Sequence, residues 1–335
     1  MIMKHSKNES GLNDTVEVEN VMIHPRKSLN RVVGQHYDPQ PYPFHDLIDD
    51  AYERIHMLHS GTERVTGYRS GLFDLDHVTG GFQPGELIVI ASVSSMGKTT
   101  LAINIAQYLS VKKSEKVATV IFSLEMPKEQ LAMRLISGIA GVEYGRALSG
   151  FLADSDLPKL DSVKELLRES RIYIDDTVGI SVNELVAKVQ HMKTDHDVGL
   201  IIIDYLQLMR GELKTDLSQD ELTRITRKLK TLARELNISI IVLSQLDSSL
   251  EKRKNGEKRP TLRDLRDAGS LENDADLILF IYRESVYCKK CRRRDGSCKC
   301  GHERNAEITV AKHRNGSTGV VSVAYFGEYG SFKTI

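Results

Sequence analysis

This sequence lacks a net charge, a long uncharged apolar run and scattered cysteines. Its 335 residues carry 46 Lys and Arg against 46 Asp and Glu, so binding of nucleic acid would have to come from local patches. Because no signal peptide or membrane-length apolar stretch is visible, we expect a soluble, cytoplasmic protein without a membrane partner. All four cysteines lie between positions 288 and 300, which favours a local metal site over a disulfide framework.

The spacing of apolar residues predicts a polar arm, a helix and one α/β domain. Residues 1–44 are polar and lack sustained periodicity, so we expect a flexible N-terminal arm. Residues 45–64 carry an apolar stripe at helical spacing, which needs a surface in its own domain or on a neighbouring subunit. Residues 65–335 are expected to form one domain, with a Cys-rich insert at 286–304.

Within residues 65–335, strand-like and helix-like patterns alternate. This alternation predicts a mostly parallel sheet with helices on both faces, completed by antiparallel strands at the C-terminal end. The expected parallel strands lie at 87–91, 117–124, 171–175, 199–204, 238–244 and 276–282, and the expected antiparallel strands at 306–313 and 319–325. The expected helices of this domain lie at 98–112, 127–140, 156–170, 181–194 and 217–236.

The most informative segment is Ser-Val-Ser-Ser-Met-Gly-Lys-Thr-Thr at 92–100, between an expected strand and an expected helix. The loop N–H groups and the helix N-terminus would cradle phosphate, Lys98 would reach the terminal phosphates of ATP, and the Thr99 hydroxyl would bind Mg²⁺. The alternative is a strand–turn–helix that binds nothing, and Ser92 stands where the usual pattern has Gly. The residues expected around the nucleotide are Ser95, Met96, Gly97, Lys98, Thr99 and Thr100.

Three apolar strands are expected to end in a polar side chain at the edge where open α/β sheets bind ligands. Asp204 would join Thr99 in the Mg²⁺ shell, and Glu125 would polarise the water that attacks the γ-phosphate. Gln245 would sense the γ-phosphate. Each also has a simpler interpretation: a turn-initiating Asp, a helix-leading Glu and a solvated Gln.

Two basic segments are candidates for phosphate contacts. The loop at 246–260, which includes Arg253, and the following segment at 263–270 have few aromatic neighbours, so backbone tracking of nucleic acid is favoured over base stacking. Lys312 and Arg314 are two residues apart on an expected strand and would share one face, where they could neutralise the γ-phosphate of a neighbouring subunit. The alternatives are a solvated charged loop and an edge strand protected by its charge.

The cysteines form two close pairs, Cys288 with Cys291 and Cys298 with Cys300. Four thiolates can hold Zn²⁺ in a tetrahedral site, and the surrounding cations favour the thiolate form. His302 is a possible substitute ligand because the second pair is tightly spaced. A structural zinc knuckle is therefore our expectation, with free thiols as the alternative.

Taken together, the motifs resemble the bacterial DnaB-type replicative helicase family from about residue 45 to the end. The resemblance rests on Ser-Met-Gly-Lys-Thr-Thr at 95–100, Ser-Leu-Glu-Met at 123–126, Ile-Asp-Tyr-Leu-Gln-Leu-Met at 203–209, Leu-Ser-Gln-Leu at 243–246, Asp-Leu-Arg-Asp-Ala-Gly-Ser at 264–270, Asp-Ala-Asp-Leu-Ile at 274–278, Phe-Ile-Tyr-Arg at 280–283 and Lys-His-Arg-Asn-Gly at 312–316. It implies a RecA-like P-loop NTPase motor assembled into a homo-hexameric ring. Such a ring would use ATP and Mg²⁺ to move on single-stranded DNA, 5′ to 3′, and unwind duplex during replication, with a helicase loader and primase as possible partners.

The resemblance also implies a role for each matching residue of the nucleotide site. Lys98 and Thr99 would bind phosphate and Mg²⁺, and Asp204 would contact the metal. Glu125 would be the catalytic carboxylate, and Gln245 would act at the γ-phosphate switch.

At the subunit interface, Lys312 and Arg314 would act in trans on the neighbouring subunit's ATP. Arg266, Asp267 and Gly269 match the family's pore-side segment that contacts the DNA backbone. The helix within 45–64 would be the linker helix that docks on the next subunit.

The chain also departs from the family pattern. A polar arm occupies the place of the helical N-terminal domain that contacts primase, Val93-Ser94 replaces a common Arg-Pro, and the Cys-rich segment lies outside the common core. Two other functions also fit the residues. One is a regulatory ATPase that binds DNA or a partner without unwinding, and the other is a recombinase-like filament former.

Overall fold

The computed structural model describes residues 41, 43–60, 65–112, 115–211, 218–253, 258–268, 271–288 and 302–335. The chain divides into two compact units, residues 1–52 and 53–335. The predicted arm at 1–44 falls almost entirely outside the described residues.

The larger unit is built on a sheet of nine strands within the described residues. Its order is β3-β2-β4-β5-β1-β6-β7-β8-β9, in which β1 to β6 are parallel and β7 to β9 are antiparallel. The strands are β1 Leu87–Ser92, β2 Ala118–Ser123, β3 Ile172–Asp175, β4 Val198–Asp204, β5 Ser239–Gln245, β6 Leu277–Tyr282, β7 Asn305–His313, β8 Gly319–Phe326 and β9 Ser331–Thr334.

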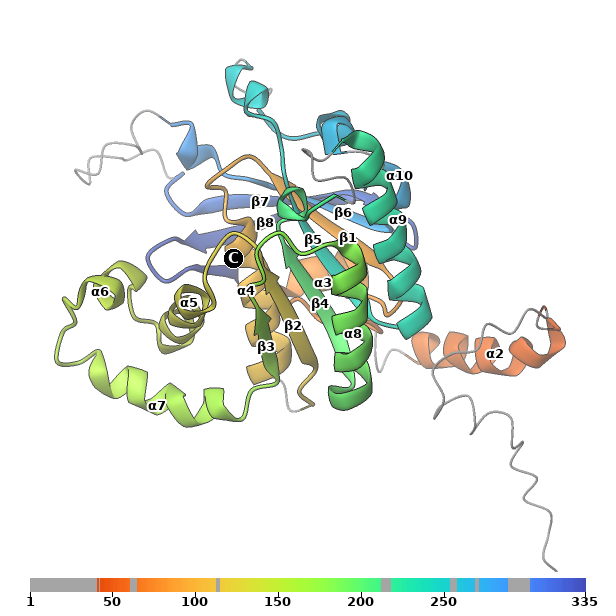
Figure 1. Ribbon diagram of the computed structural model, residues 1–335, viewed down its shortest axis with the longest axis horizontal. Coiled ribbons are helices and arrows are strands. Elements are labelled where there is room, and N and C mark those ends of the chain that lie inside the picture. Colours follow the sequence, from red (N-terminus) through yellow and green to blue (C-terminus); the bar gives the residue numbers. More distant parts are fainter. Residues whose placement is uncertain are drawn as a thin grey trace, which may run out of the picture. The chain divides into compact units, whose positions relative to one another are not determined.

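Helices cover both faces of this sheet (Figure 1). The helices of this unit are α3 Phe73–Thr79, α4 Lys98–Gln107, α5 Lys128–Ala140, α6 Tyr144–Ser149, α7 Leu157–Arg168, α8 Val182–His196, α9 Gln219–Leu236 and α10 Leu271–Asp274. A π-helical turn, Tyr108–Lys112, continues α4, and a 3₁₀ turn, Leu262–Ala268, precedes α10. The parallel strands have apolar residues on both faces because helices cover both.

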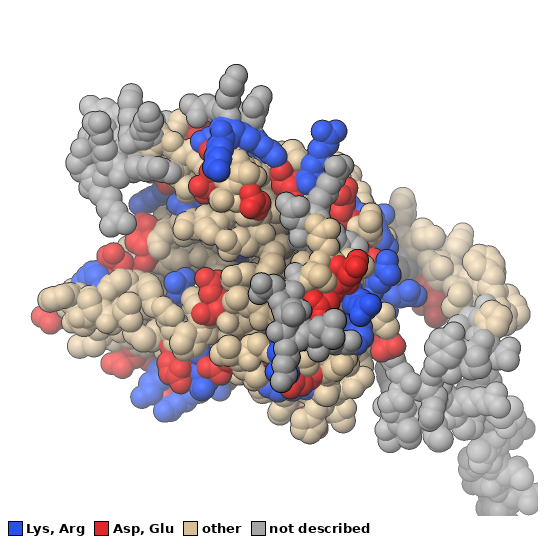
Figure 2. All heavy atoms as spheres, turned by 45° about the horizontal axis from the view of Figure 1, so that its top comes forward, with Lys and Arg blue, Asp and Glu red and all other residues tan. Residues whose placement is uncertain are grey.

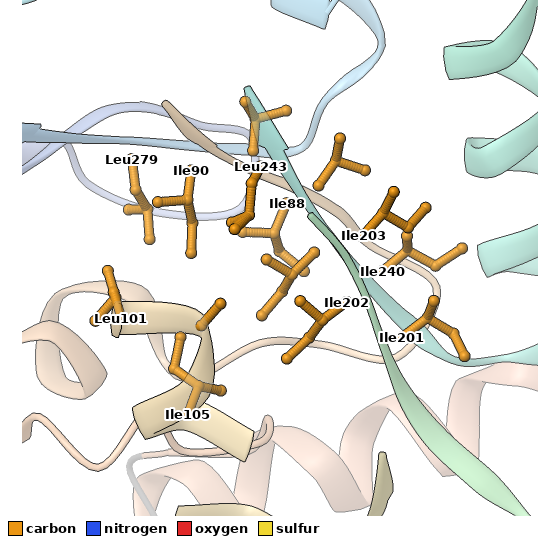
Figure 3. Close-up of a cluster of buried hydrophobic side chains, with 14 of the residues drawn as sticks. Ile88, Ile90, Leu101, Ile105, Ile201, Ile202, Ile203, Ile240, Leu243 and Leu279 are labelled. Atoms are coloured by element: carbon orange, nitrogen blue, oxygen red, sulfur yellow. The ribbon is translucent and has the colours of Figure 1, made fainter. Parts of the chain in front are cut away.

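The core is a sandwich of branched aliphatic side chains around the central strands (Figure 3). On one face, Ile88 and Ile90 of β1 lie toward α4, from which Leu101 and Ile105 project. On the other face, Ile201, Ile203 and Ile240 lie toward the helices that cover β4 and β5. All of these side chains are essentially fully buried, and burying each contributes about 1.5–3 kcal/mol. The central strands are therefore a rigid base for the loops at their ends.

Helix α2, His45–His59, forms where the sequence predicts a helix within residues 45–64. Its stripe of large apolar side chains is exposed by 42 to 62% in the single chain. The stripe consists of Leu47, Ile48, Tyr52, Ile55 and Leu58.

The structure confirms the predicted α/β class and places both ends of each of the eight predicted strands within one residue of the prediction. It adds β9 and the short helices α3, α6 and α10, which the sequence analysis did not predict. These elements have four to seven residues, too few for an apolar period to stand out.

Candidate nucleotide site

The carboxyl ends of β1, β2, β4 and β5 meet at one edge of the sheet. In the strand register, Ser92 at the end of β1 lies beside Gln245, and Ser123 at the end of β2 lies beside Asp204. The loops that follow these strands therefore converge, as expected for a ligand site in an open α/β sheet.

The loop between β1 and α4 has the backbone that a phosphate cradle requires. Gly97 has φ of 103°, and a side chain there would also meet the rings of Phe332 and Tyr325 at 3.1–3.2 Å. Ser95 also has a positive φ, of 63°. Ser92, by contrast, ends β1 with ordinary backbone and is fully buried, so no Gly is needed there. The replacement of the usual first Gly is thus compatible with the loop.

Lys98, the first residue of α4, turns back over the loop. Its Nζ donates to the backbone oxygens of Ser92 at 3.0 Å and Val93 at 3.3 Å, and to the Ser92 hydroxyl at 3.4 Å. Burial lowers the pKa of Lys98 to about 8, although the nearby charges of Asp204 and Glu125 act in the opposite direction. A partly buried ammonium held by uncharged oxygen atoms is well placed to gain from an anionic ligand.

Thr99 and Asp204 come together from α4 and β4. The Thr99 hydroxyl donates to Asp204 Oδ2 at 2.7 Å, and Asp204 is only 5% exposed. Burial raises the pKa of Asp204 to about 6, the Thr99 hydrogen bond lowers it, and the charge of Glu125 raises it further. A hydroxyl and a costly buried carboxylate are the oxygen ligands that suit Mg²⁺ beside phosphate.

Glu125 and Gln245 lie at the same edge but reach into solvent. Both side chains are exposed, and the charge of Glu125 raises the pKa values of Lys98 and Asp204. Gln207 holds the end of β5, because its Nε2 donates to Ser244 Oγ and to Gln245 O, each at 3.1 Å. The site thus combines a partly buried cluster of Lys98, Thr99 and Asp204 with an exposed carboxylate beside it.

Two arginines near this site were not predicted from the sequence. Arg283, just after β6, donates from Nη1 to Ser95 O at 3.1 Å and stacks over the Tyr325 ring at 3.6 Å. Arg134, on α5, lowers the pKa of Asp204 through its charge. Neither arginine lies in a phosphate-loop motif. Arg283 is the last residue of the Phe-Ile-Tyr-Arg motif at 280–283, which was the one sequence signal that pointed to it.

Lys312 and Arg314 lie at the opposite edge of the sheet. Lys312 pairs with Ile278 near the start of β6, and Arg314 N donates to Asp276 O just before that strand. Strand β1 runs parallel to β6 beside it, and Lys98 follows the carboxyl end of β1, whereas the two cations lie near the start of β6. A six-residue strand is about 17 Å long. These two cations therefore cannot reach the phosphate loop of their own chain.

The predicted DNA-binding residues are described only in part. Arg253 forms an ion pair with Asp264, which also accepts from Thr261 N at 2.7 Å. Arg266 and Asp267 lie in the 3₁₀ turn before α10, but their side chains are not among the described ones, and neither is Gly269. Arg253 thus helps to close its own loop, and its contact with DNA stays a prediction.

The predicted zinc site lies mostly outside the described residues. Of its four cysteines only Cys288 is described, while Cys291, Cys298 and Cys300 are not. Among the residues that are described, no group of three or more His, Cys, Asp or Glu is suitably placed for a metal ion. In the same part of the chain, no helix combines the length and apolarity needed to cross a membrane.

The raised pKa of Asp204 predicts how its replacement changes stability with pH. Its folded pKa of about 6 lies above its ordinary value of 3.8, so its stabilising contribution is complete below pH 3.8 and is lost as pH rises through 6. The free energy of unfolding of Asp204→Asn, measured relative to that of the wild type without nucleotide or metal, should therefore increase by about 3 kcal/mol as the pH is raised from about 4 to 7. Urea denaturation at both pH values measures this, and a difference that stays constant would contradict the assignment.

Comparisons with known proteins find relatives among the replicative DNA helicases. The chain is 39% identical over 317 residues to the replicative DNA helicase DnaC of Bacillus subtilis (strain 168), covering 94% of this chain and 67% of that protein. It is 40% identical over 288 residues to the replicative DNA helicase DnaB of Geobacillus stearothermophilus, covering 86% of this chain and 61% of that protein. The chain thus spans about two thirds or less of the length of these relatives.

Solved structures show the same likeness. One, described as an ATPase domain, matches with a TM-score of 0.78 and 33% identity, over 88% of this chain and all of that chain. A DnaB-like replicative helicase, described with its interactions with primase, matches with a TM-score of 0.74 and 32% identity, over 92% of this chain and 71% of that chain. These matches confirm the RecA-like fold class. The model of the DnaB-like helicase C-terminal domain matches residues 67–334, and the chain belongs to that family.

Proposed function

We propose that this chain is the motor of a ring-shaped, ATP-dependent DNA helicase that acts in replication. The observation that carries the proposal is the separation of two half-sites. The phosphate loop, Thr99 and Asp204 lie at one edge of the sheet, and the Lys312–Arg314 pair lies at the other. One copy supplies the first half-site and the next copy supplies the second, so that ATP would be hydrolysed between subunits.

The residues present fit ATP and Mg²⁺. The loop N–H groups and Lys98 would hold the phosphates, and Thr99 with Asp204 would hold the metal, which neutralises charge on the β- and γ-oxygens. Glu125 is the exposed carboxylate beside them and would orient the attacking water. Gln245 would report the γ-phosphate to the basic loop that follows it.

Trans action requires assembly, for which we propose a homo-hexamer. An apolar groove of about 510 Å³ lies between α5 and α7, lined by Leu135, Ile136, Leu160 and Leu167 together with the charged residues Asp161, Lys164 and Arg168. Helix α2 of a neighbouring copy would fit it, because α2 exposes an apolar stripe that matches the aliphatic lining, while its acidic residues lie on the opposite face of the helix. This contact gives α2 the role of the linker helix.

The DNA would be held by the segments that follow β5. Figure 2 shows Lys and Arg side chains gathered at the upper edge of the view, and Figure 1 places the turns after β5 at the top. Lys252 and Arg259 of this segment are exposed. We assign single-stranded DNA contacts to Arg253, Arg266, Asp267 and Gly269, with movement 5′ to 3′. The two arginines would neutralise phosphates, so affinity should fall steeply with salt.

A solved relative is described with its interactions with primase, so we propose primase as a partner of the assembled ring, and a helicase loader as a second. A regulatory ATPase that does not unwind remains the competing function, and the following experiment separates the two.

Lys98→Ala should reduce ATP turnover by at least about 100-fold, because it removes the ammonium that faces the phosphates. The test is strand separation of a forked DNA with ATP, run beside ATPase measurements. Wild-type protein should do both, and Lys98→Ala neither. ATP hydrolysis by the wild type without strand separation would instead support the regulatory ATPase.

Arg314→Ala should reduce turnover by about 10³-fold while nucleotide binding stays close to that of the wild type, because the side chain lies far from its own phosphate loop. Steady-state ATPase and titration with a fluorescent ADP give the two numbers. Normal turnover in this variant would refute the trans role.

Ile55→Asp should raise the protein concentration needed for assembly about tenfold or more, since it places an unpaired charge in the proposed α2 contact. Glu53→Gln is the matched control, because helical spacing places Glu53 on the side of α2 opposite the apolar stripe. Sedimentation velocity over a concentration series measures both variants, and equal assembly would exclude α2 from the interface.

A further inference from the structure

The Lys312–Arg314 pair is held in place by the last turn of α10. Lys312 Nζ donates to Glu272 O at 2.6 Å and to Asn273 O at 3.1 Å, and Arg314 Nη2 donates to Asn273 O at 2.5 Å. The last carbonyls of a helix have no partner within the helix and carry partial negative charge, so two cations are suitable partners. The position of α10 thus determines where the positive charge of the pair lies.

Asp276, two residues after α10, holds the same arginine. Its carboxylate is buried, with the residue 5% exposed, and Oδ1 lies 3.6 Å from Arg314 Nη1. Its backbone oxygen accepts from Arg314 N at 2.9 Å. Asp276 therefore contacts Arg314 at both ends, at the backbone and at the guanidinium.

The other carboxylate oxygen of Asp276 is bound to the rest of the motor. Oδ2 accepts from Leu87 N, the first residue of β1, at 2.8 Å and from Lys230 Nζ at 2.6 Å. Asp276 N also donates to Leu87 O at 2.9 Å. The buried side chain of Asp276 thus contacts both Arg314 and the first residue of β1, the strand that leads to the phosphate loop.

Lys230 alone would balance the charge of a buried carboxylate, so the contact with Arg314 needs its own explanation. Arg has a long, flexible side chain, and a cation that acts across a subunit boundary is effective only when its geometry is restricted beforehand. Three contacts restrict Arg314: the carboxylate of Asp276, the backbone oxygen of Asp276 and the backbone oxygen of Asn273.

We propose that Asp276 is a positioning residue for Arg314, which it orients toward the ATP of the neighbouring subunit. The inference rests on the proposed trans role of Arg314. It also assigns a function to the second acid of Asp274-Ala-Asp276, which lies outside the nucleotide site. The same contacts make α10, which directly follows the segment assigned to DNA, the element that links this segment to the trans-acting cations.

The competing explanation is that Asp276 only stabilises the fold. Asp276→Asn separates the two, because its amide oxygen still accepts from Leu87 N while its charge is lost. We expect kcat to fall about 10- to 100-fold with fluorescent-ADP affinity close to that of the wild type. Lys230→Met is the matched control: it removes the other cation from the same carboxylate, and its kcat should stay near the wild-type value even if its melting temperature falls.

A double-mutant cycle with Arg314→Lys, in the full chain with single-stranded DNA, tests whether Asp276 acts through Arg314. If it does, Asp276→Asn should change kcat by no more than about threefold in the Arg314→Lys background. A full 10- to 100-fold loss in both backgrounds, a normal kcat for Asp276→Asn, or an equal loss with Lys230→Met would each overturn the inference. If Asp276→Asn does not fold, Asp276→Glu replaces it, since it keeps the charge but moves the carboxylate.

The Arg314→Ala measurement distinguishes failure of this inference from failure of the proposed function. Reduced turnover in Arg314→Ala together with normal turnover in Asp276→Asn would reject only the positioning role. Normal turnover in Arg314→Ala would reject the trans site and the positioning role together.

Discussion

The burial of β1 at the centre of the parallel sheet constrains everything around it. Its six residues are fully buried between β5 and β6, so the strand cannot shift along its axis without exposing apolar side chains and breaking two ladders. The strand ends in the phosphate loop, and its first residue is bound to Asp276. The distance between the two half-sites is therefore set by the length of a rigid strand.

The electrostatics of the nucleotide site follow from the same burial. Asp204 and Lys98 are taken out of water by the sheet and α4, which raises the pKa of the carboxylate and lowers the pKa of the ammonium. Both changes disfavour the charged forms when the site faces only protein. A bound polyanion would favour the charged form of Lys98, and its divalent cation would favour the charged form of Asp204. Ligand binding would therefore offset the cost of removing these two charges from water.

If ATP is hydrolysed between subunits, as proposed, then activity depends on assembly. A chain that holds its arginine about a strand length from its own phosphate loop gains nothing from that arginine alone. In the proposed ring, the exposed stripe of α2 would meet the groove between α5 and α7 of the next copy, since a closed ring of identical subunits needs two different contact surfaces on each chain. The proposed function thus depends on these two contact surfaces as well as on the nucleotide site.

Local patterns in the sequence were enough to predict the α/β class, the parallel strands and the residues of the phosphate loop, because apolar period and a Gly-Lys-Thr turn are properties of short segments. They also predicted that Asp204, Glu125 and Gln245 share one edge, since parallel strands end together. Folding in three dimensions was needed to show that Thr99 bonds to Asp204, 105 residues away, and that Arg283 supports Ser95. It was also needed to place Arg314 on Asp276 at the far edge, because that contact depends on the register in which antiparallel β7 pairs with β6, which shifts between Ile278 and Leu279, and no local pattern specifies that register.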